Sequence, residues 1–220
     1  MAVSRRRREV VAQVTLHIPK PRIHRYVRVA VDGPDGSGKT TFADELAAAV
    51  RDHGRPAARI SLDDFHHVRA IRYRQGRESA EGFWQDSYNY ERFRRDVLEP
   101  FAPAGSGRYR PAAHDLKTDK MLDPEPCTAA PGTVLIVDGL FLHRDEIATA
   151  WDLSVFLEVP FGTTAKRMAD RDGTDPDPEH PTMRRYVEAQ RLYFRRCSPQ
   201  QRADILIDNQ NVDAPHILRG

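Results

Sequence analysis

Apolar positions along the chain follow two periodicities, one typical of buried strands and one typical of amphipathic helices. Residues 27–32 have apolar side chains at alternate positions and are rich in valine, which predicts a strand. Within 38–53 the apolar residues recur at the spacing of one helical face, which predicts a helix. The most apolar run of the chain, residues 133–137, predicts a central strand buried on both faces.

The same patterns extend over the rest of the chain, with two exceptions. Residues 66–86 are rich in charged residues, glycine and serine and are interpreted as a loop, and 100–132 form a proline-bearing excursion. Strands that alternate with helices predict an α/β fold of three layers, with a doubly wound parallel sheet of about five strands in the middle. The remaining strands are predicted at 58–62, 153–159 and 203–207, and the remaining helices at 88–99, 162–171 and 181–196.

Between the first predicted strand and the first predicted helix, residues 33–40 have the pattern G-x-x-x-x-G-K-[ST] of a phosphate-binding loop. Glycines let the backbone wrap closely around a polyphosphate, so that successive N–H groups point at it. The helix N-terminus that follows adds a partial positive charge. The pattern predicts a P-loop NTPase-type fold that binds ATP, with nucleotide contacts from Gly33, Asp35, Gly36, Ser37, Gly38, Lys39, Thr40 and Thr41.

Three side chains, two in this segment and one after a later strand, are of the types that phosphoryl transfer requires. Lys39 is expected to reach the β- and γ-phosphates as a catalytic residue, and the hydroxyl of Thr40 is expected to bind Mg²⁺. Asp138 follows the most apolar strand, where a carboxylate commonly lies near the metal, although an ordinary strand-end turn with Gly139 is the alternative. ATP and Mg²⁺ are therefore the expected cofactors.

Two adjacent carboxylates, Asp63 and Asp64, follow the second predicted strand. In an extended chain neighbouring side chains point to opposite sides, so only one of the two faces the γ-phosphate. A carboxylate there accepts the proton of a substrate hydroxyl or holds Mg²⁺. We assign Asp63 as the catalytic base and a substrate-binding residue, with Asp64 as the second candidate, and a helix N-cap is the structural alternative.

Taken in order, these motifs resemble the uridine kinase-like branch of the P-loop kinases, which includes pantothenate kinase and phosphoribulokinase. Besides the phosphate-binding loop, the resemblance rests on the stretch 62–66 and on Asp138-Gly139. It continues with a C-terminal helix, then Pro199, then the strand at 203–207. The resemblance implies an ATP-dependent kinase for a small hydroxyl-bearing acceptor, above all a pyrimidine nucleoside such as uridine or cytidine.

The resemblance also implies further site residues. Uridine-cytidine kinases contact the base with a Tyr and with a His five residues later, a spacing that Tyr109 and His114 keep. These enzymes have an arginine-rich lid. In this chain Arg167 would contribute to substrate binding and Arg171 to catalysis, within a short lid at about 167–181. Members of the family are often oligomers, so a homo-oligomer is one expected state.

Two departures from the family keep other functions open. The lid is short and rich in Asp and Pro, and Arg185 stands where nucleoside kinases place a Gln that reads the pyrimidine edge. A guanidinium donates hydrogen bonds but accepts none, so recognition of a base would have to differ. The alternatives are a kinase for another small metabolite, such as pantothenate or a ribosyl compound, and a nucleotide-binding switch that is not a kinase.

Two groups of side chains have both a functional and a structural interpretation. Aromatic residues after the second strand either stack on a base or form the apolar underside of their segment. Arginines of the same region either hold a phosphate or ribose or are solvated. The aromatic residues are Phe83, Trp84, Tyr88 and Tyr90, and the arginines are Arg72, Arg74 and Arg77. A metal-binding pair of His66 and His67 is a weaker prediction because no third ligand accompanies it.

Length, charge and cysteine content narrow the class of protein. The 220 residues suffice for one kinase domain, assigned to 26–220, after a basic leader and linker at 1–25. The net charge of +2, with interspersed acids and bases, argues against nucleic acid as a partner. The run Arg5–Arg8 is interpreted as a solvated tail or the start of a leader helix, with RNA contact as the alternative. Two cysteines outside any metal-ligand spacing, and the lack of a membrane-spanning apolar run, predict a cytoplasmic protein without membrane contact.

Overall fold

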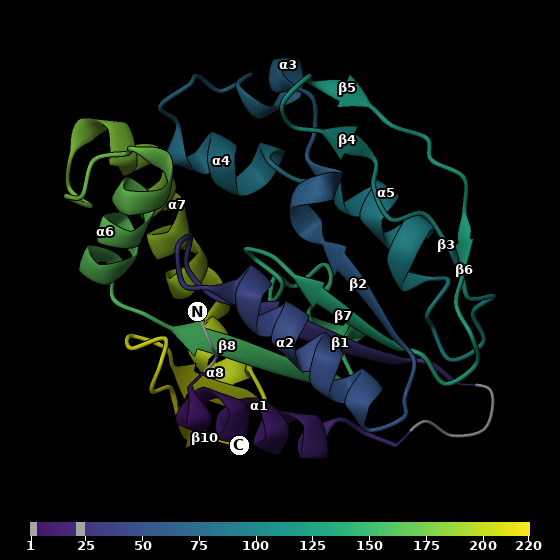
Figure 1. Ribbon diagram of the computed structural model, residues 1–220. Coiled ribbons are helices and arrows are strands. Elements are labelled where there is room, and N and C mark those ends of the chain that lie inside the picture. The colour runs from purple at the N-terminus through teal and green to yellow at the C-terminus, as the bar shows by residue number, and fades with distance from the viewer. Residues whose placement is uncertain (1–3, 21–24) are drawn as a thin grey trace.

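A six-stranded sheet forms the centre of the computed structural model, which describes residues 4–20 and 25–220 (Figure 1). Its strands are β1 (Val27–Asp32), β2 (Ala57–Ser61), β7 (Val134–Asp138), β8 (Leu153–Glu158), β9 (Ile205–Asp208) and β10 (His216–Arg219). The order across the sheet is β10-β9-β8-β1-β7-β2. All neighbours pair in parallel except β10 and β9. The predicted α/β fold with five parallel strands is therefore confirmed, and β10 is an antiparallel edge strand that the sequence pattern did not predict.

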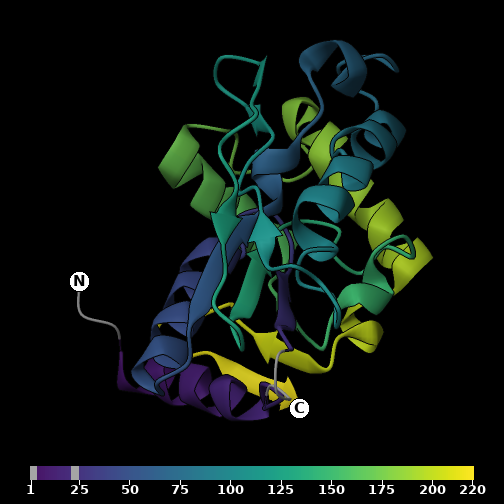
Figure 2. The same ribbon diagram turned by 90° about the vertical axis from the view of Figure 1, so that its right-hand side faces the viewer.

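Helices cover both faces of the sheet and complete the three layers (Figures 1 and 2). One face is covered by α1 (Arg5–His17) and α2 (Lys39–Asp52), whose apolar residues share a core with β1. The opposite face is covered by α4 (Ala80–Asp86), the helical segment 90–98 and α7 (Pro181–Cys197). The remaining helical elements are η1 (Leu62–Phe65), α3 (Arg69–Arg72), η3 (Ala148–Ala150), α6 (Phe161–Asp172) and α8 (Pro199–Arg202).

The first helix is packed onto the sheet domain. Val10 and Val14 of α1 are fully buried against α2. Within the basic run, Arg7 is buried and its Nε donates to Glu45 of α2 at 2.6 Å, whereas Arg5 is exposed. Residues 1–3 and 21–24 of the predicted leader and linker lie outside the described residues. We keep 26–220 as the proposed kinase domain, with α1 packed on its outer face. No helix in the described part of the chain is long and apolar enough to cross a membrane.

Residues 66–86 contain two short helices, so the interpretation of this segment as a loop was wrong. α3 has a single turn, and α4 is capped by Ser79, whose hydroxyl accepts a hydrogen bond from the N–H of Gly82 at 2.9 Å. In α4, Trp84 packs edge-on against Phe141 with ring centroids 4.9 Å apart. Tertiary packing of one aromatic face therefore stabilises a helix that the charged and glycine-rich composition concealed.

The proline-bearing excursion forms two small hairpins. In the first, β3 (Arg108–Tyr109) pairs with β6 (Cys127–Thr128), and in the second, β4 (His114–Asp115) pairs with β5 (Lys120–Met121). In Figure 1, β4 and β5 lie above α5, and β3 and β6 lie to its right. The predicted helix at 88–99 consists of α5 (Tyr90–Phe93) followed directly by a π-helical turn, η2 (Arg94–Leu98).

The parallel strands bring the candidate residues to one edge of the sheet. The phosphate-binding loop follows β1, η1 with its two carboxylates follows β2, and Asp138 is the last residue of β7. Because β1 and β2 both pair in parallel with β7, their carboxyl ends lie on the same side. Ligands of such sheets bind beyond these ends, which is where the predicted site is assembled.

Candidate active site

The phosphate-binding loop has the close backbone packing that its glycines allow. Gly36 has φ of +74°, and a Cβ there would lie 2.8 Å from the carbonyl oxygen of Thr164. A Cβ on Gly33 would lie 2.7 Å from the carbonyl oxygen of Leu157. Both distances are too short for any larger residue, so the loop fits against β8 and α6 only with glycine at these positions.

Two predicted site residues of the loop, Lys39 and Thr40, form side-chain hydrogen bonds. Lys39 Nζ donates to the carbonyl of Pro34 across the loop at 2.8 Å. Thr40 Oγ1 donates to Asp138 Oδ2 at 2.6 Å, so the two predicted metal ligands are in direct contact. The Ser37 hydroxyl is buried and has no hydrogen-bond partner among the described residues. Thr41 is exposed in the first turn of α2.

These residues fit a nucleotide bound with Mg²⁺. The loop provides backbone donors, an unpartnered hydroxyl and a lysine for phosphate, and Thr40 and Asp138 provide hard oxygen ligands. Mg²⁺ commonly takes one or two protein oxygens together with substrate phosphates, so no cage of protein ligands is needed. In the part of the chain that the structure describes, no group of three or more His, Cys, Asp or Glu side chains is arranged to hold a metal ion.

An arginine that the sequence analysis missed orients Asp138. Arg59 Nη2 in β2 donates to Asp138 Oδ1 at 2.9 Å, and its Nε donates to Asp44 of α2 at 2.9 Å. Asp138 is 2 % exposed, so this pairing offsets the cost of burying its charge. With Oδ1 held by Arg59, Oδ2 remains directed at Thr40.

Beneath the loop lies a second group that the sequence analysis missed. Asp32, the last residue of β1, is fully buried and accepts the N–H of Gly33 through Oδ1 at 2.7 Å. Its Oδ2 accepts from His143 Nδ1 at 2.8 Å and from the hydroxyl of Tyr193 in α7. These bonds fix the start of the loop. The only sequence signal was a polar residue ending an apolar strand, because His143 and Tyr193 are far away along the chain.

A cleft of about 490 Å³ opens beside the loop. It brings together Asp35 of the loop, Asp63 and Arg171, the predicted base and lid arginine. The lining residues are Asp35, Asp63, His66, Arg69, Arg72, Tyr73, Phe83, Ser87, Tyr88, Leu116, Met168, Arg171, Asp172, Thr174, Met183, Arg185 and Tyr186.

The charges of the lining groups act on one another. Burial raises the pKa of Asp35, and the Asp63 carboxylate raises it further, whereas the Lys39 and Arg171 cations lower it. Asp35, Asp63 and Arg171 all line the cleft, so their charges lie close enough to influence one another. The Asp35 backbone N–H also donates to Gln190 Oε1 of α7 at 3.0 Å, which attaches the loop to that helix.

Asp63 and Asp64 point to different sides, as predicted, although they lie in the 3-10 helix η1 rather than at a strand end. Asp63 lines the cleft, and its Oδ1 accepts from the hydroxyl of Tyr88 at 3.0 Å. Asp64 is outside the cleft lining. Its pKa is raised to about 6 by burial and by the charges of Asp63 and Asp138, with Arg59 opposing them.

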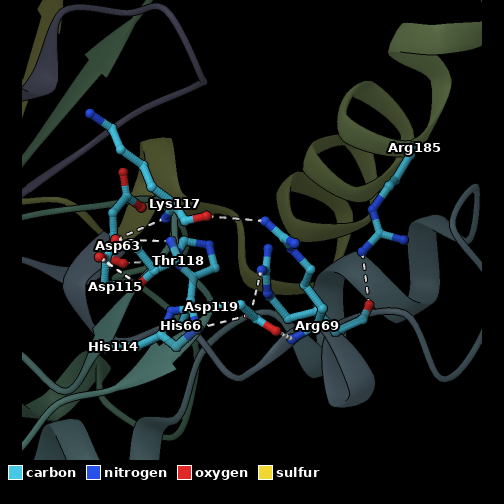
Figure 3. A network of polar contacts seen from close by, with 10 residues as sticks. Asp63, His66, Arg69, His114, Asp115, Lys117, Thr118, Asp119 and Arg185 are labelled. Atoms are coloured by element: carbon cyan, nitrogen blue, oxygen red, sulfur yellow. Dashed lines mark hydrogen bonds and ion pairs between the residues drawn. The ribbon is translucent and has the colours of Figure 1, made fainter.

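Three predicted substrate-binding residues lie outside the cleft lining. Arg167 donates to the carbonyls of Gly36 at 3.3 Å and Asn209 at 3.0 Å, so it joins the phosphate-binding loop to the end of β9. Tyr109 belongs to β3, and its ring packs on that of Phe101 with the centroids 5.0 Å apart. His114 is buried behind the cleft wall, with the contact to Asp119 that Figure 3 shows.

The aromatic residues have mixed roles. Phe83 and Tyr88 line the cleft, whereas Trp84 and Tyr90 stack on Arg144, at 4.1 and 4.9 Å from the guanidinium carbon. His66 also lines the cleft, and burial lowers its pKa. Its Nδ1 must carry the proton, because it lies 2.8 Å from the Asp63 carbonyl oxygen, which only accepts.

The sheet topology, the glycine loop and the cleft together define a P-loop protein with the fold of the small-molecule kinases. A family model described as an AAA domain matches residues 29–192, so the chain belongs to the AAA domain family. No curated protein matches the chain.

Solved structures of P-loop kinases share this fold. A structure described as that of a possible uridine kinase from Bacillus stearothermophilus is 23% identical with a TM-score of 0.71, over 91% of this chain and 96% of that one. Phosphoribulokinase from Rhodobacter spheroides is 17% identical with a TM-score of 0.58, over 84% and 70%. D-glycerate 3-kinase from Cryptococcus neoformans is 12% identical with a TM-score of 0.51, over 96% and 95%. The resemblance noted in the sequence is thus confirmed for the fold.

Proposed function

We propose that this protein is an ATP-dependent kinase that phosphorylates a hydroxyl group of a small acceptor. The observation that carries the proposal is that the Asp63 carboxylate shares one cleft with Asp35 of the phosphate-binding loop and with Arg171 of α6. A proton acceptor, a phosphate cradle and a cation around one space are the parts that phosphoryl transfer needs. The fold shared with the kinases above supports the same reaction class.

The roles of the residues follow from their contacts. Asp63 takes the proton of the acceptor hydroxyl through Oδ2, because Oδ1 already accepts from Tyr88. The hydroxyl oxygen then bonds to the γ-phosphorus of ATP, and the bond from that phosphorus to the bridging oxygen of ADP breaks. Lys39 and Arg171 stabilise the charge on the transferring group. Thr40 and Asp138 would hold Mg²⁺, which would supply further positive charge against the phosphates.

The proposed lid, residues 167–181, joins the two sides of the cleft. Met168, Arg171 and Thr174 of this segment line the cleft. Gly173 ends α6 with φ of +71°, so the chain turns sharply there before the connection to α7. Closing this segment over bound substrates would exclude water, which otherwise competes with the acceptor for the phosphoryl group.

The acceptor is proposed as a class rather than a single compound. The sequence resemblance favoured uridine or cytidine, and the fold shared with a possible uridine kinase supports that choice. The two residues expected to read the pyrimidine, Tyr109 and His114, are absent from the cleft lining. Pantothenate and ribosyl compounds therefore have equal standing as candidates, and a nucleotide-dependent switch is the alternative outside the kinases.

The test is ADP release from Mg·ATP in the presence of a panel of acceptors. The panel contains uridine, cytidine, nicotinamide riboside, pantothenate, ribulose 5-phosphate and a sample without acceptor. We expect one acceptor class to stimulate ADP release well above the sample without acceptor. The Lys39→Ala variant serves as control and is expected to lose transfer entirely, because the charge that faces the β- and γ-phosphates is removed.

Two results would contradict the proposal. Equal ADP release with and without every acceptor would favour a simple ATPase or a switch. Full transfer by Lys39→Ala would show that the predicted loop does not bind the transferring phosphate.

A further inference from the structure

The charges that line the cleft are unevenly distributed. Asp63 and Asp35 lie at the side of the phosphate-binding loop. Arg69 and Arg72 of α3 and Arg185 of α7 line the other side, which we call the arginine end. Figure 3 shows Arg69 between Asp63 and Arg185. A lining with three guanidinium groups at one end favours a ligand with negative charge there.

Arg185 is fixed in place by the backbone. It is 5 % exposed, and its Nη1 and Nη2 donate to carbonyl oxygens of the 72–79 segment, at 3.0 Å in the cases of Gly76 and Arg72. Carbonyls carry no net charge, so these bonds orient the guanidinium without neutralising it. Its Nε has no hydrogen-bond partner among the described residues.

Arg72 is also buried and incompletely paired. It is 8 % exposed, and its charge partner among the described residues is Asp119, 3.4 Å from Nη2. Asp119 also accepts from His114 Nε2 at 3.1 Å and from the Arg69 backbone N–H at 2.9 Å, so its charge is shared. In the described residues, the Nε of Arg72 has no partner.

Arg69 is the accessible member of the three. It is exposed, and its guanidinium donates to the Lys117 carbonyl through Nη2 at 3.3 Å. The remaining donors of Arg69 are available to a ligand in the cleft. Burial lowers the pKa of Arg185, and the nearby Arg72 cation lowers it too, whereas Tyr186, Tyr73 and the Asp86 carboxylate raise it. An anion at this end would relieve the repulsion between Arg72 and Arg185.

We propose that the arginine end binds an acidic group of the acceptor, a phosphate monoester or a carboxylate. Arg69 and Arg72 contact this group, and Arg185 positions the segment that carries them. The acceptor hydroxyl then lies at Asp63, at the other end of the cleft. This inference rests on the proposed kinase function and narrows its substrate class to anionic hydroxy compounds, in place of neutral nucleosides.

Matched pairs of acceptors test the inference in the kinase assay. Each pair keeps the hydroxyl groups and changes only the acid: pantothenate against panthenol, glycerate against glycerol, and ribulose 5-phosphate against ribulose. We expect the acidic member of one pair to have at least 100-fold higher kcat/KM than the neutral member. The pair that responds distinguishes a carboxylate from a phosphate ester.

Substitutions then locate the anion site. Arg69→Gln is expected to raise KM for the acidic acceptor about 10- to 100-fold, the usual effect of losing a charged hydrogen bond. Its kcat should change less than about threefold, because the phosphate-binding loop and Asp63 are untouched. Arg69→Lys keeps the charge and should recover most of the affinity. Arg77→Gln, in the same segment but outside the cleft lining, is the matched control and should behave as the unmodified protein.

A binding measurement keeps the inference testable if no acceptor is phosphorylated. Inorganic phosphate is titrated into the protein saturated with Mg·ADP, so that the phosphate-binding loop is already filled. We expect binding that weakens at least tenfold in both Arg69→Gln and Arg72→Gln but not in Arg77→Gln. Phosphate at the γ-phosphate position would not respond to these arginines.

The outcomes separate the two proposals. Absent turnover with arginine-dependent phosphate binding would overturn the kinase function and leave the anion site standing. Turnover of neutral acceptors at the same kcat/KM as acidic ones would support the kinase and overturn the anion site. Phosphate binding unchanged in both Arg69→Gln and Arg72→Gln would also overturn it.

Discussion

The two halves of the proposed site are built from different kinds of structure. The proposed nucleotide half is one continuous segment, 33–40, whose backbone would form the phosphate cradle and whose Thr40 side chain contacts Asp138. The acceptor half is a wall of side chains from η1, α3, α4, α6 and α7. A backbone cradle requires glycines at fixed spacing, whereas a side-chain wall has no such requirement. The first half can therefore be predicted from the sequence, whereas the second can be recognised only in the folded structure.

The largest expected effect separates the chemistry from nucleotide binding. Asp63→Asn should lower kcat about 100-fold or more, the usual scale for a lost general base, with the Kd for Mg·ATP little changed. The carboxylate lies in the acceptor half, and Asn keeps its shape and an oxygen for the Tyr88 hydroxyl. Steady-state kinetics with the accepted substrate and an independent titration of nucleotide binding provide the measurement.

Asp64→Asn is the matched control for that prediction. The two carboxylates are adjacent, but only Asp63 lines the cleft. If Asp64→Asn lowers kcat strongly and Asp63→Asn does not, Asp64 rather than Asp63 is the catalytic base.

The second prediction affects only the nucleotide half. Gly36→Ala should weaken Mg·ATP binding about 10- to 100-fold, since a positive φ and a 2.8 Å approach to Thr164 O together cost on the order of 1–3 kcal/mol. Gly54→Ala is the control, because Gly54 has a similar φ of +76° but nothing within 4 Å of its added Cβ. It should lose stability but bind nucleotide normally. Equal nucleotide affinities in the two variants would show that the loop does not need its close backbone approach.

The same contrast explains which predictions from the sequence succeeded. The contact of Thr40 with Asp138 was predictable because a motif fixes one residue and the end of an apolar parallel strand fixes the other. The spacing of Tyr109 and His114 matches a kinase pattern, but two separate hairpins hold them outside the cleft lining. Spacing in a long irregular segment does not determine distance in space. Arg185 was identified as a departure, yet its carbonyl partners depend on tertiary packing.

Helix α7 belongs to both halves. Its N-terminal part lines the acceptor wall through Arg185 and Tyr186, and one to two turns later Gln190 and Tyr193 contact the loop region through Asp35 and Asp32. A rigid helix that touches both halves gives a physical route by which an occupied acceptor cleft can affect the loop. This arrangement could not be inferred from the helical periodicity alone, which shows an amphipathic helix but not its polar partners.

The smallest expected effect concerns Asp64, at the junction of the two halves. Its pKa of about 6 in the folded protein exceeds the ordinary value of 3.8. At pH values between 3.8 and about 6, Asp64 holds a proton in the folded protein that it has lost in the unfolded chain. The free energy of unfolding therefore falls as pH rises through this range. Asp64→Asn removes this dependence. It should therefore be more stable than the unmodified protein at pH 7.5, and the difference should vanish near pH 4.

Solvent screening limits the size of this effect, because the Asp64 carboxyl is only partly desolvated and the residue as a whole is exposed. The stability gain is expected at about 1 kcal/mol or less. For a domain of this size that corresponds to a rise in Tm of about 2–4 °C. Thermal unfolding of both proteins at pH 4, 5, 6 and 7.5 provides the measurement, since other titrating groups cancel in the difference. A Tm difference that is constant with pH would mean that the pKa of Asp64 is not raised in the folded protein. It would also mean that the charges of Asp63 and Asp138 do not act on Asp64.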